Sequence, residues 1–152
     1  MGITGPKNSA VPVKRCIIMV PLIVRENAIL QDADIYKRII EYIQRDHTVL
    51  TEYVGDLSRS NTEGLISSDV AIYEQDTAWL LESDVVIAEC STPSLGVGYE
   101  LAFAEAYGIP VHIFYNKVCS NLSEMLSDDL YFQVHPYEAE EEIYPVIDGI
   151  LA

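Results

Sequence analysis

Short, continuous apolar segments constrain the fold of this chain most. Residues 15–20 (RCIIMV), 85–88 (VVIA) and 110–115 (PVHIFY) show no alternation of polar and apolar positions. Strands that are buried on both faces have this character, and such strands belong to parallel sheets covered by helices on each side. Longer segments with helical periodicity lie between them. The sequence therefore predicts an α/β fold built around a buried parallel sheet.

The remaining elements complete one domain of this kind. Helices are predicted at residues 32–45, 67–82, 96–107, 121–126 and 138–151, and further strands at 48–53 and 131–134. Gly108 is expected to end the 96–107 helix, and Pro145 to kink the last helix or end its first half. We expect a single domain at 15–152 after a flexible tail at 1–14. Its predicted form is a flavodoxin-like three-layer sandwich with five parallel strands ordered 2-1-3-4-5.

Composition excludes several classes of protein. The net charge of −15 leaves no basic face for a nucleic acid, although a small anion remains admissible. No apolar run is long enough to span a membrane and no signal peptide opens the chain, so we expect a cytoplasmic protein, with the nucleus as the alternative. Three cysteines, odd in number and far apart, argue against a disulfide framework or a zinc site. Cys90 is either a buried, inert thiol or a lone nucleophile.

The fold predicts where a ligand binds. In a sheet of this order, ligands lie beyond the carboxyl ends of the first and third strands, where the strand order reverses. Two loops follow those strands, at residues 21–29 and 89–95. The polar segment 54–66 is a further long loop of the kind that often binds ligands.

Two carboxylates interrupt apolar helix faces on either side of the third strand. Asp76 is predicted to lie on the same helix face as Ile72 and Leu80. Glu100 is predicted to lie on the same face as Val97 and Ala104. Burying a carboxylate costs free energy unless it is paired or used. The structural alternative is a carboxylate at the edge of the apolar face, capped or paired.

The chemical alternative is glycosyl transfer. Glu100 is expected in the first turn of its helix, where the helix dipole keeps it ionised and fit to be a nucleophile. Asp76 is expected in mid-helix, where desolvation raises its pKa toward that of a general acid.

Other candidates accompany this pair. The segment Ser94 to Gly98 (SLGVG) opens a helix and could receive a phosphate, although short Gly/Ser loops before helices are common. Tyr53 and Tyr99 are the best candidates for stacking on a base. His112, inside an apolar strand, is expected to be a core histidine and not a base.

Several motifs resemble one enzyme family. They are EQDxxWL at 74–80, DVVIAE at 84–89, PSLGVGYEL at 93–101, VLTE at 49–52, LSxM at 122–125 and FQV at 132–134. Together they are similar to the 2′-deoxynucleoside 5′-phosphate N-hydrolases of the nucleoside 2-deoxyribosyltransferase superfamily. The PSLGVGYE block is long and specific, and the likeness extends over most of the chain.

The resemblance implies a site and an assembly. Glu100 would attack C1′ of the deoxyribose, and Asp76 would assist departure of the base. Ser94 and the N–H of Gly96 would contact the 5′-phosphate. Ser123 would contact the phosphate across a homodimer. The resemblance implies no metal and no organic cofactor.

One part of the chain departs from the family. After the first strand, the family carries Tyr followed by Gly-Ser-x-Arg, whose Ser and Arg hold the phosphate, whereas Ile17, Val20, Pro21 and Ile23 align there in this sequence. Arg25 is a candidate to supply the missing cation from a shifted loop. Tyr53 also stands where close relatives have His.

The leading interpretation is therefore a hydrolase of the N-glycosidic bond of 2′-deoxynucleoside 5′-monophosphates, acting through a covalent deoxyribosyl-glutamate. One alternative is a deoxyribosyltransferase that uses unphosphorylated nucleosides, which the altered loop favours. The other is a nucleotide-binding homologue without activity.

Overall fold

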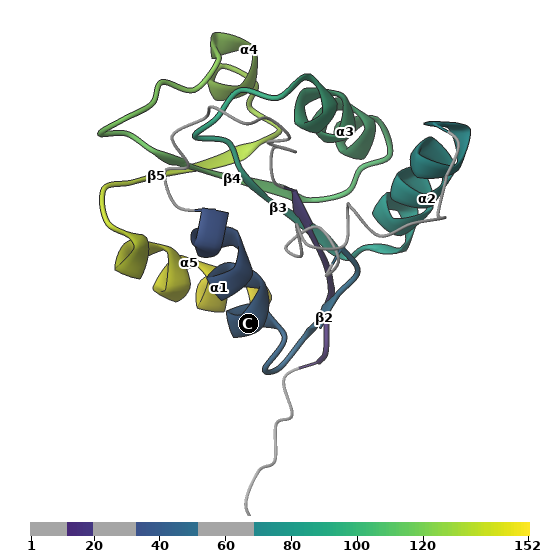
Figure 1. Ribbon diagram of the computed structural model, residues 1–152, viewed down its shortest axis with the longest axis horizontal. Coiled ribbons are helices and arrows are strands. Elements are labelled where there is room, and N and C mark those ends of the chain that lie inside the picture. The colour runs from purple at the N-terminus through teal and green to yellow at the C-terminus, as the bar shows by residue number, and fades with distance from the viewer. Residues whose placement is uncertain (1–11, 20–32, 52–68) are drawn as a thin grey trace, which may run out of the picture.

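The computed structural model describes residues 12–19, 33–51 and 69–152, and a parallel sheet forms its centre (Figure 1). The strands are β1 (Arg15–Met19), β2 (Thr48–Val49), β3 (Val85–Glu89), β4 (Val111–Asn116) and β5 (Gln133–Tyr137). Their order is β2-β1-β3-β4-β5, and every neighbouring pair is parallel. The predicted sheet and its order are confirmed.

Helices cover both faces of the sheet, as predicted. They are α1 (Ala33–Ile43), α2 (Asp69–Glu82), α3 (Leu95–Ala106), α4 (Glu124–Ser127) and α5 (Ile143–Leu151), with a 3-10 turn, η3 (Glu140–Glu142), before the last. Helices α1 and α5 pack on one face, and α2 and α3 pack on the other (Figure 1). None of the described helices is long and apolar enough to cross a membrane.

Strand β3 shows why its sequence lacks alternation. All five of its residues are buried. Val85 and Ile87 pack into the core that contains α1 and α5, whereas Val86 and Ala88 pack into the core that contains α2 and α3. Because both faces are covered, β3 can present side chains to a ligand only at its ends, and the fold predicts the carboxyl end.

Local signals fix both ends of α3. The hydroxyl of Ser94, which precedes the helix, accepts the N–H of Val97 at 3.3 Å and caps the first turn. At the other end, Gly108 has φ of +69° and donates to the carbonyl of Glu105, while Ile109 donates to that of Ala104. This Schellman arrangement needs a left-handed residue, so glycine ends the helix as predicted.

The last strand and the last helix differ from the prediction. Strand β5 begins and ends later than residues 131–134, because His135 and Pro136, which look like turn residues, continue the strand. A proline is tolerated there because β5 is an edge strand. The predicted 138–151 helix is divided into η3 and α5, and Pro145 lies in the first turn of α5, where a missing N–H costs nothing.

The predicted second strand and short helix are shorter than expected. Strand β2 comprises two residues of the predicted 48–53, and the 121–126 helix is the single turn α4. Residues 1–11, the loop 21–29 and the loop 54–66 lie outside the described residues.

Candidate functional site

Helices α2 and α3 bring the two predicted carboxylates together. Both helices pack against the same core beside β3, and the charge of Asp76 acts directly on Glu100. Helix α3 follows β3 and so begins at the carboxyl edge of the sheet, where the fold predicts the ligand. Asp76 therefore lies close enough to Glu100 for its charge to act on that carboxyl, and the two remain the candidate catalytic pair.

The structure corrects the expected charge of Glu100. Helix α3 begins at Leu95, so Glu100 is its sixth residue and lies beyond the first turn, where the helix dipole would have favoured the ionised form. Burial and, to a smaller extent, the neighbouring charge of Asp76 raise the pKa of the Glu100 carboxyl to about 7. Glu100 is therefore close to half protonated near neutral pH.

Asp76 behaves in the predicted direction. It lies in the middle of α2, and burial raises its pKa above the ordinary aspartate value. Two adjacent carboxyls with raised pKa values bind and release protons as a pair. Because the charge of Asp76 is one of the two causes that raise the pKa of Glu100, a proton on Asp76 favours ionisation of Glu100.

Ser94, Gly98 and Ser123 line one pocket of about 580 Å³ on another side of α3. The pocket lies between α3 and the segment that contains α4, and neither Asp76 nor Glu100 is among its lining residues. A Cβ at Gly98 would meet nothing within 4 Å, so internal packing does not demand this glycine. The structure thus places Ser94, Gly98 and Ser123 of one chain around one pocket, whereas the resemblance implied that Ser123 serves the neighbouring site of a homodimer. Gly96 does not line the pocket.

The charged side chains that line this pocket are acidic. Glu105 and Asp129 line it, whereas no Lys or Arg of the described ranges does. An anion bound there would depend on serine hydroxyls and on the N–H groups at the start of α3. Within residues 12–19, 33–51 and 69–152, no cluster of His, Cys, Asp or Glu side chains could hold a metal ion.

Tyr99 lies at the surface next to the carboxylate pair. Its side chain is 59% exposed, and its ring meets that of Tyr73 edge-on, with centroids 6.4 Å apart. Tyr73 comes from α2, three residues before Asp76. Sequence analysis did not single out Tyr73. The other two predicted contacts, Tyr53 and Arg25, lie outside the described residues.

The surroundings of Cys90 and His112 favour structural roles for both residues. Burial raises the pKa of the Cys90 thiol to about 12, so the thiol is neutral and a poor nucleophile. Burial lowers the pKa of His112 to about 4, and its Nδ1 lies 2.9 Å from Nε2 of His135. His112 is 8% exposed, which confirms a core histidine. All three cysteines are free.

A third carboxylate at the same edge escaped the sequence analysis. Glu89, the last residue of β3, is only 4% exposed. The sequence pattern that could have identified Glu89 is an acidic residue at the end of an otherwise apolar strand, immediately before the loop that carries Ser94.

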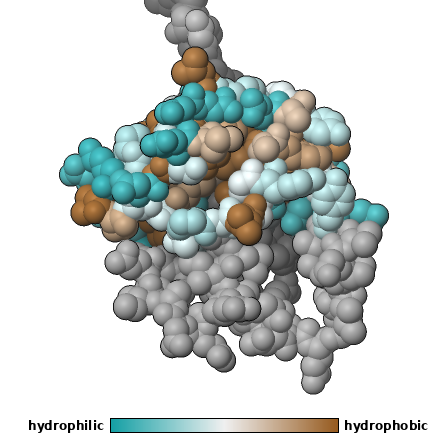
Figure 2. All heavy atoms as spheres, turned by 90° about the horizontal axis from the view of Figure 1, so that it is seen from above, coloured by the Kyte–Doolittle hydropathy of each residue, from teal (hydrophilic) through white to brown (hydrophobic). Residues whose placement is uncertain are grey.

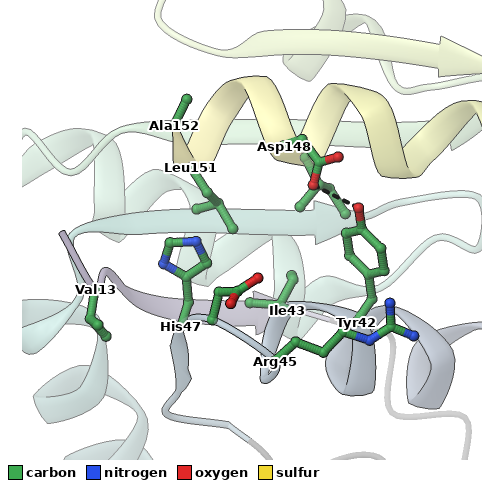
Figure 3. A pocket seen from close by; sticks show the side chains of 10 residues that line it. Val13, Tyr42, Ile43, Arg45, His47, Asp148, Leu151 and Ala152 are labelled. Atoms are coloured by element: carbon green, nitrogen blue, oxygen red, sulfur yellow. Dashed lines mark hydrogen bonds between the residues drawn. The ribbon is translucent and has the colours of Figure 1, made fainter. Parts of the chain in front are cut away.

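A second hollow lies at the opposite end of the molecule. About 710 Å³ in volume, it is lined by the last residues of α1 and α5 and by the residues that precede β1 and β2 (Figure 3). Tyr42 donates a hydrogen bond to Asp148 at 2.7 Å beside it. This hollow faces the amino ends of the strands and contains none of the predicted site residues.

The chain is similar to known proteins over most of its length. A nucleoside 2-deoxyribosyltransferase family model matches residues 28–133. The 5-hydroxymethyl-dUMP N-hydrolase of Mus musculus is 41% identical over 118 residues, which cover 74% of this chain and 68% of the mouse protein. The protein of the same name from Esox lucius is 39% identical over 127 residues, with coverage of 80% and 84%.

A solved structure has the same fold. The CMP N-glycosidase BcmB of Clostridium botulinum superposes with a TM-score of 0.63 over 91% of this chain and 100% of that one, at 18% sequence identity. The fold, the sequence matches and the two carboxylates all indicate the same family. This chain belongs to the nucleoside 2-deoxyribosyltransferase family.

Proposed function

We propose that this protein hydrolyses the N-glycosidic bond of 2′-deoxynucleoside 5′-monophosphates and releases a free base and deoxyribose 5-phosphate. The observation that carries the proposal is the Asp76–Glu100 pair, in which burial raises the pKa of both carboxyls and the charge of Asp76 adds to the rise at Glu100. Retaining glycosidases use two carboxyls of this kind, one as nucleophile and one as acid.

The proposed reaction uses the two carboxyls in two steps. Ionised Glu100 attacks C1′ of the deoxyribose and forms a deoxyribosyl ester, while the bond from C1′ to the base nitrogen breaks and Asp76 gives its proton to the base. Water then attacks C1′ of the ester. Asp76 takes a proton from this water, and Glu100 leaves as a carboxylate.

The names of the relatives support a phosphorylated deoxynucleoside as substrate. The mouse and pike proteins are both called 5-hydroxymethyl-dUMP N-hydrolase. In this chain, Ser94 and the first N–H groups of α3 are candidates to bind the 5′-phosphate. Because no described Lys or Arg lines that pocket, we expect weaker dependence on the phosphate than a site with a cation would show.

Product analysis tests this proposal. Purified protein is incubated with deoxynucleosides and their 5′-monophosphates, including 5-hydroxymethyl-dUMP, and bases and sugars are separated by chromatography. We expect free base and deoxyribose 5-phosphate, with kcat/KM at least about tenfold higher for monophosphates than for nucleosides.

Two other outcomes would contradict it. Exchange of bases between unphosphorylated nucleosides would identify a deoxyribosyltransferase, which the altered sequence after β1 favours. Nucleotide-induced thermal stabilisation without any product would identify a binding protein.

We also propose that the protein is a homodimer, with Ser123 completing the neighbouring site. Leu95 at the start of α3 and Met125 in α4 are 97% and 83% exposed, and both line the pocket that contains Ser123. Hydrophobic residues reach the surface among hydrophilic ones (Figure 2). Side chains of this size at one rim support burial against a second copy.

Solution mass tests the dimer. We expect light scattering to give twice the 17.0 kDa of the chain, and Leu95→Asp to shift the protein toward 17.0 kDa because a buried charge opposes association. Val118→Asp is the matched control, since Val118 is 73% exposed but lies in the turn after β4. A wild-type mass of 17.0 kDa would exclude the dimer.

A further inference from the structure

Glu89 is a buried carboxylate with no role in the proposed reaction. It ends β3 at the carboxyl edge and is 4% exposed. Its side chain belongs to the opposite face of the sheet from Asp76 and Glu100, because its hydrogen-bond partners include Tyr36 of α1. Burial of a carboxylate costs several kcal/mol unless donors surround it, so this position needs a physical reason.

Four donors converge on the two oxygens of Glu89. Tyr36 donates to Oε2 at 3.2 Å, and the backbone N–H of Ser91 donates to the same oxygen at 3.3 Å. Tyr137 donates to Oε1 at 2.8 Å, and the hydroxyl of Ser91 donates to the same oxygen. Each of these described partners is neutral. The carboxylate raises the pKa of both tyrosines, in each case after the effect of burial.

Ser91 connects this carboxylate to the loop before α3. Its hydroxyl donates to Glu89 and also accepts the backbone N–H of Asn116, at the end of β4, at 2.8 Å. Both its backbone and its side chain are therefore bound to fixed groups. Three residues later, Ser94 caps α3 and lines the pocket described above.

We propose that Glu89 and Ser91 form a clasp that positions the loop to Ser94, and with it the first turn of α3, for the substrate. Glu89 is then a positioning residue, and this inference rests on the proposed function. The clasp connects β3, β4 and β5 to the loop that carries Ser94, the residue proposed to bind the phosphate. Binding geometry that is fixed in advance reduces the ordering cost of binding.

Two variants distinguish a role of Glu89 in positioning the loop from a role of its partners in merely stabilising a buried carboxylate. Ser91→Ala removes the hydroxyl that links Glu89 to the loop. Tyr36→Phe removes a hydroxyl from the same carboxylate but leaves the loop contacts in place, so it is the matched control. We expect Ser91→Ala to raise KM for a deoxynucleoside 5′-monophosphate about tenfold with kcat within about threefold, and Tyr36→Phe to change KM less than about twofold.

Two more variants test whether Glu89 and Ser91 act together. Ser91→Thr keeps the hydroxyl and should restore KM. Glu89→Gln should raise KM as Ser91→Ala does, because an amide cannot accept at both of its ends. The double variant should be no worse than either single one, since both remove the same clasp.

Hydrogen exchange provides a readout that does not depend on activity. Backbone amides of residues 91–98 should exchange faster in Ser91→Ala than in wild type or in Tyr36→Phe. If wild type released no base but this exchange pattern appeared, the proposed function would fail and the clasp would stand. Equal KM and equal exchange in Ser91→Ala and Tyr36→Phe would overturn the clasp, whatever the activity.

Discussion

Replacing Glu100 by Gln is expected to lower kcat for base release by at least about 10⁴-fold. The amide cannot form the deoxyribosyl ester, so only slow, uncatalysed departure of the base remains. Because Gln keeps the shape of Glu, the nucleotide should still bind, with a dissociation constant within about tenfold of wild type. Base release is followed by chromatography and binding by calorimetry.

A stability measurement distinguishes a chemical cause for the lower kcat of Glu100→Gln from a failure to fold. Since the pKa of Glu100 is raised from 4.5 to about 7, the folded protein binds this proton more tightly than the unfolded chain does. This group therefore lowers the free energy of unfolding as pH rises from 4.5 to about 7. Glu100→Gln should remove that loss and be more stable than wild type by about 2 kcal/mol at pH 8, but not at pH 4.

Urea denaturation at the two pH values measures this difference. Glu82→Gln, at the exposed far end of α2, is the control and should change neither activity nor stability. Base release by Glu100→Gln at more than about a tenth of the wild-type rate would exclude Glu100 as the nucleophile.

The fold was largely predictable because strands that are buried on both faces have continuous apolar sequences. Residues 85–88 are apolar without alternation since each side of β3 meets a helix layer. Gly108 identified a helix end because its position requires a positive φ. The error at β5 has the opposite cause. An edge strand is only partly buried, so His135 and Pro136 resemble turn residues.

The sequence was enough to predict which carboxylates form the candidate site, but not their pKa values. A carboxylate in an apolar stripe is visible in the sequence, and the charge of Asp76 does act on Glu100. Their relative pKa values depend on where α3 begins and on how deeply each carboxyl is buried, which spacing alone does not give. Glu89 was missed because its partners, Tyr36 and Tyr137, are 53 and 48 residues distant and belong to other elements.

Asp76→Asn should have the second largest effect, and its pH dependence identifies its role. If the active form carries one proton on the pair, wild-type kcat/KM is highest below about pH 7 and falls above it, as the pair loses that proton. An amide cannot ionise or give a proton to the base. Asp76→Asn should therefore lower kcat by about 10²–10⁴-fold and lack the fall above pH 7.

The acidic side of the profile gives an independent test. Burial is the larger cause of the raised pKa of Glu100, and the charge of Asp76 is the smaller one. Without that charge, the pKa of Glu100 should fall part of the way toward 4.5, so the remaining activity should persist to lower pH. Glu74→Gln, on the exposed surface of α2 two residues before Asp76, is the matched control and should keep the wild-type profile. A wild-type kcat/KM that instead rises through pH 7 to a plateau would mean that only ionised Glu100 is needed and that Asp76 does not act as an acid.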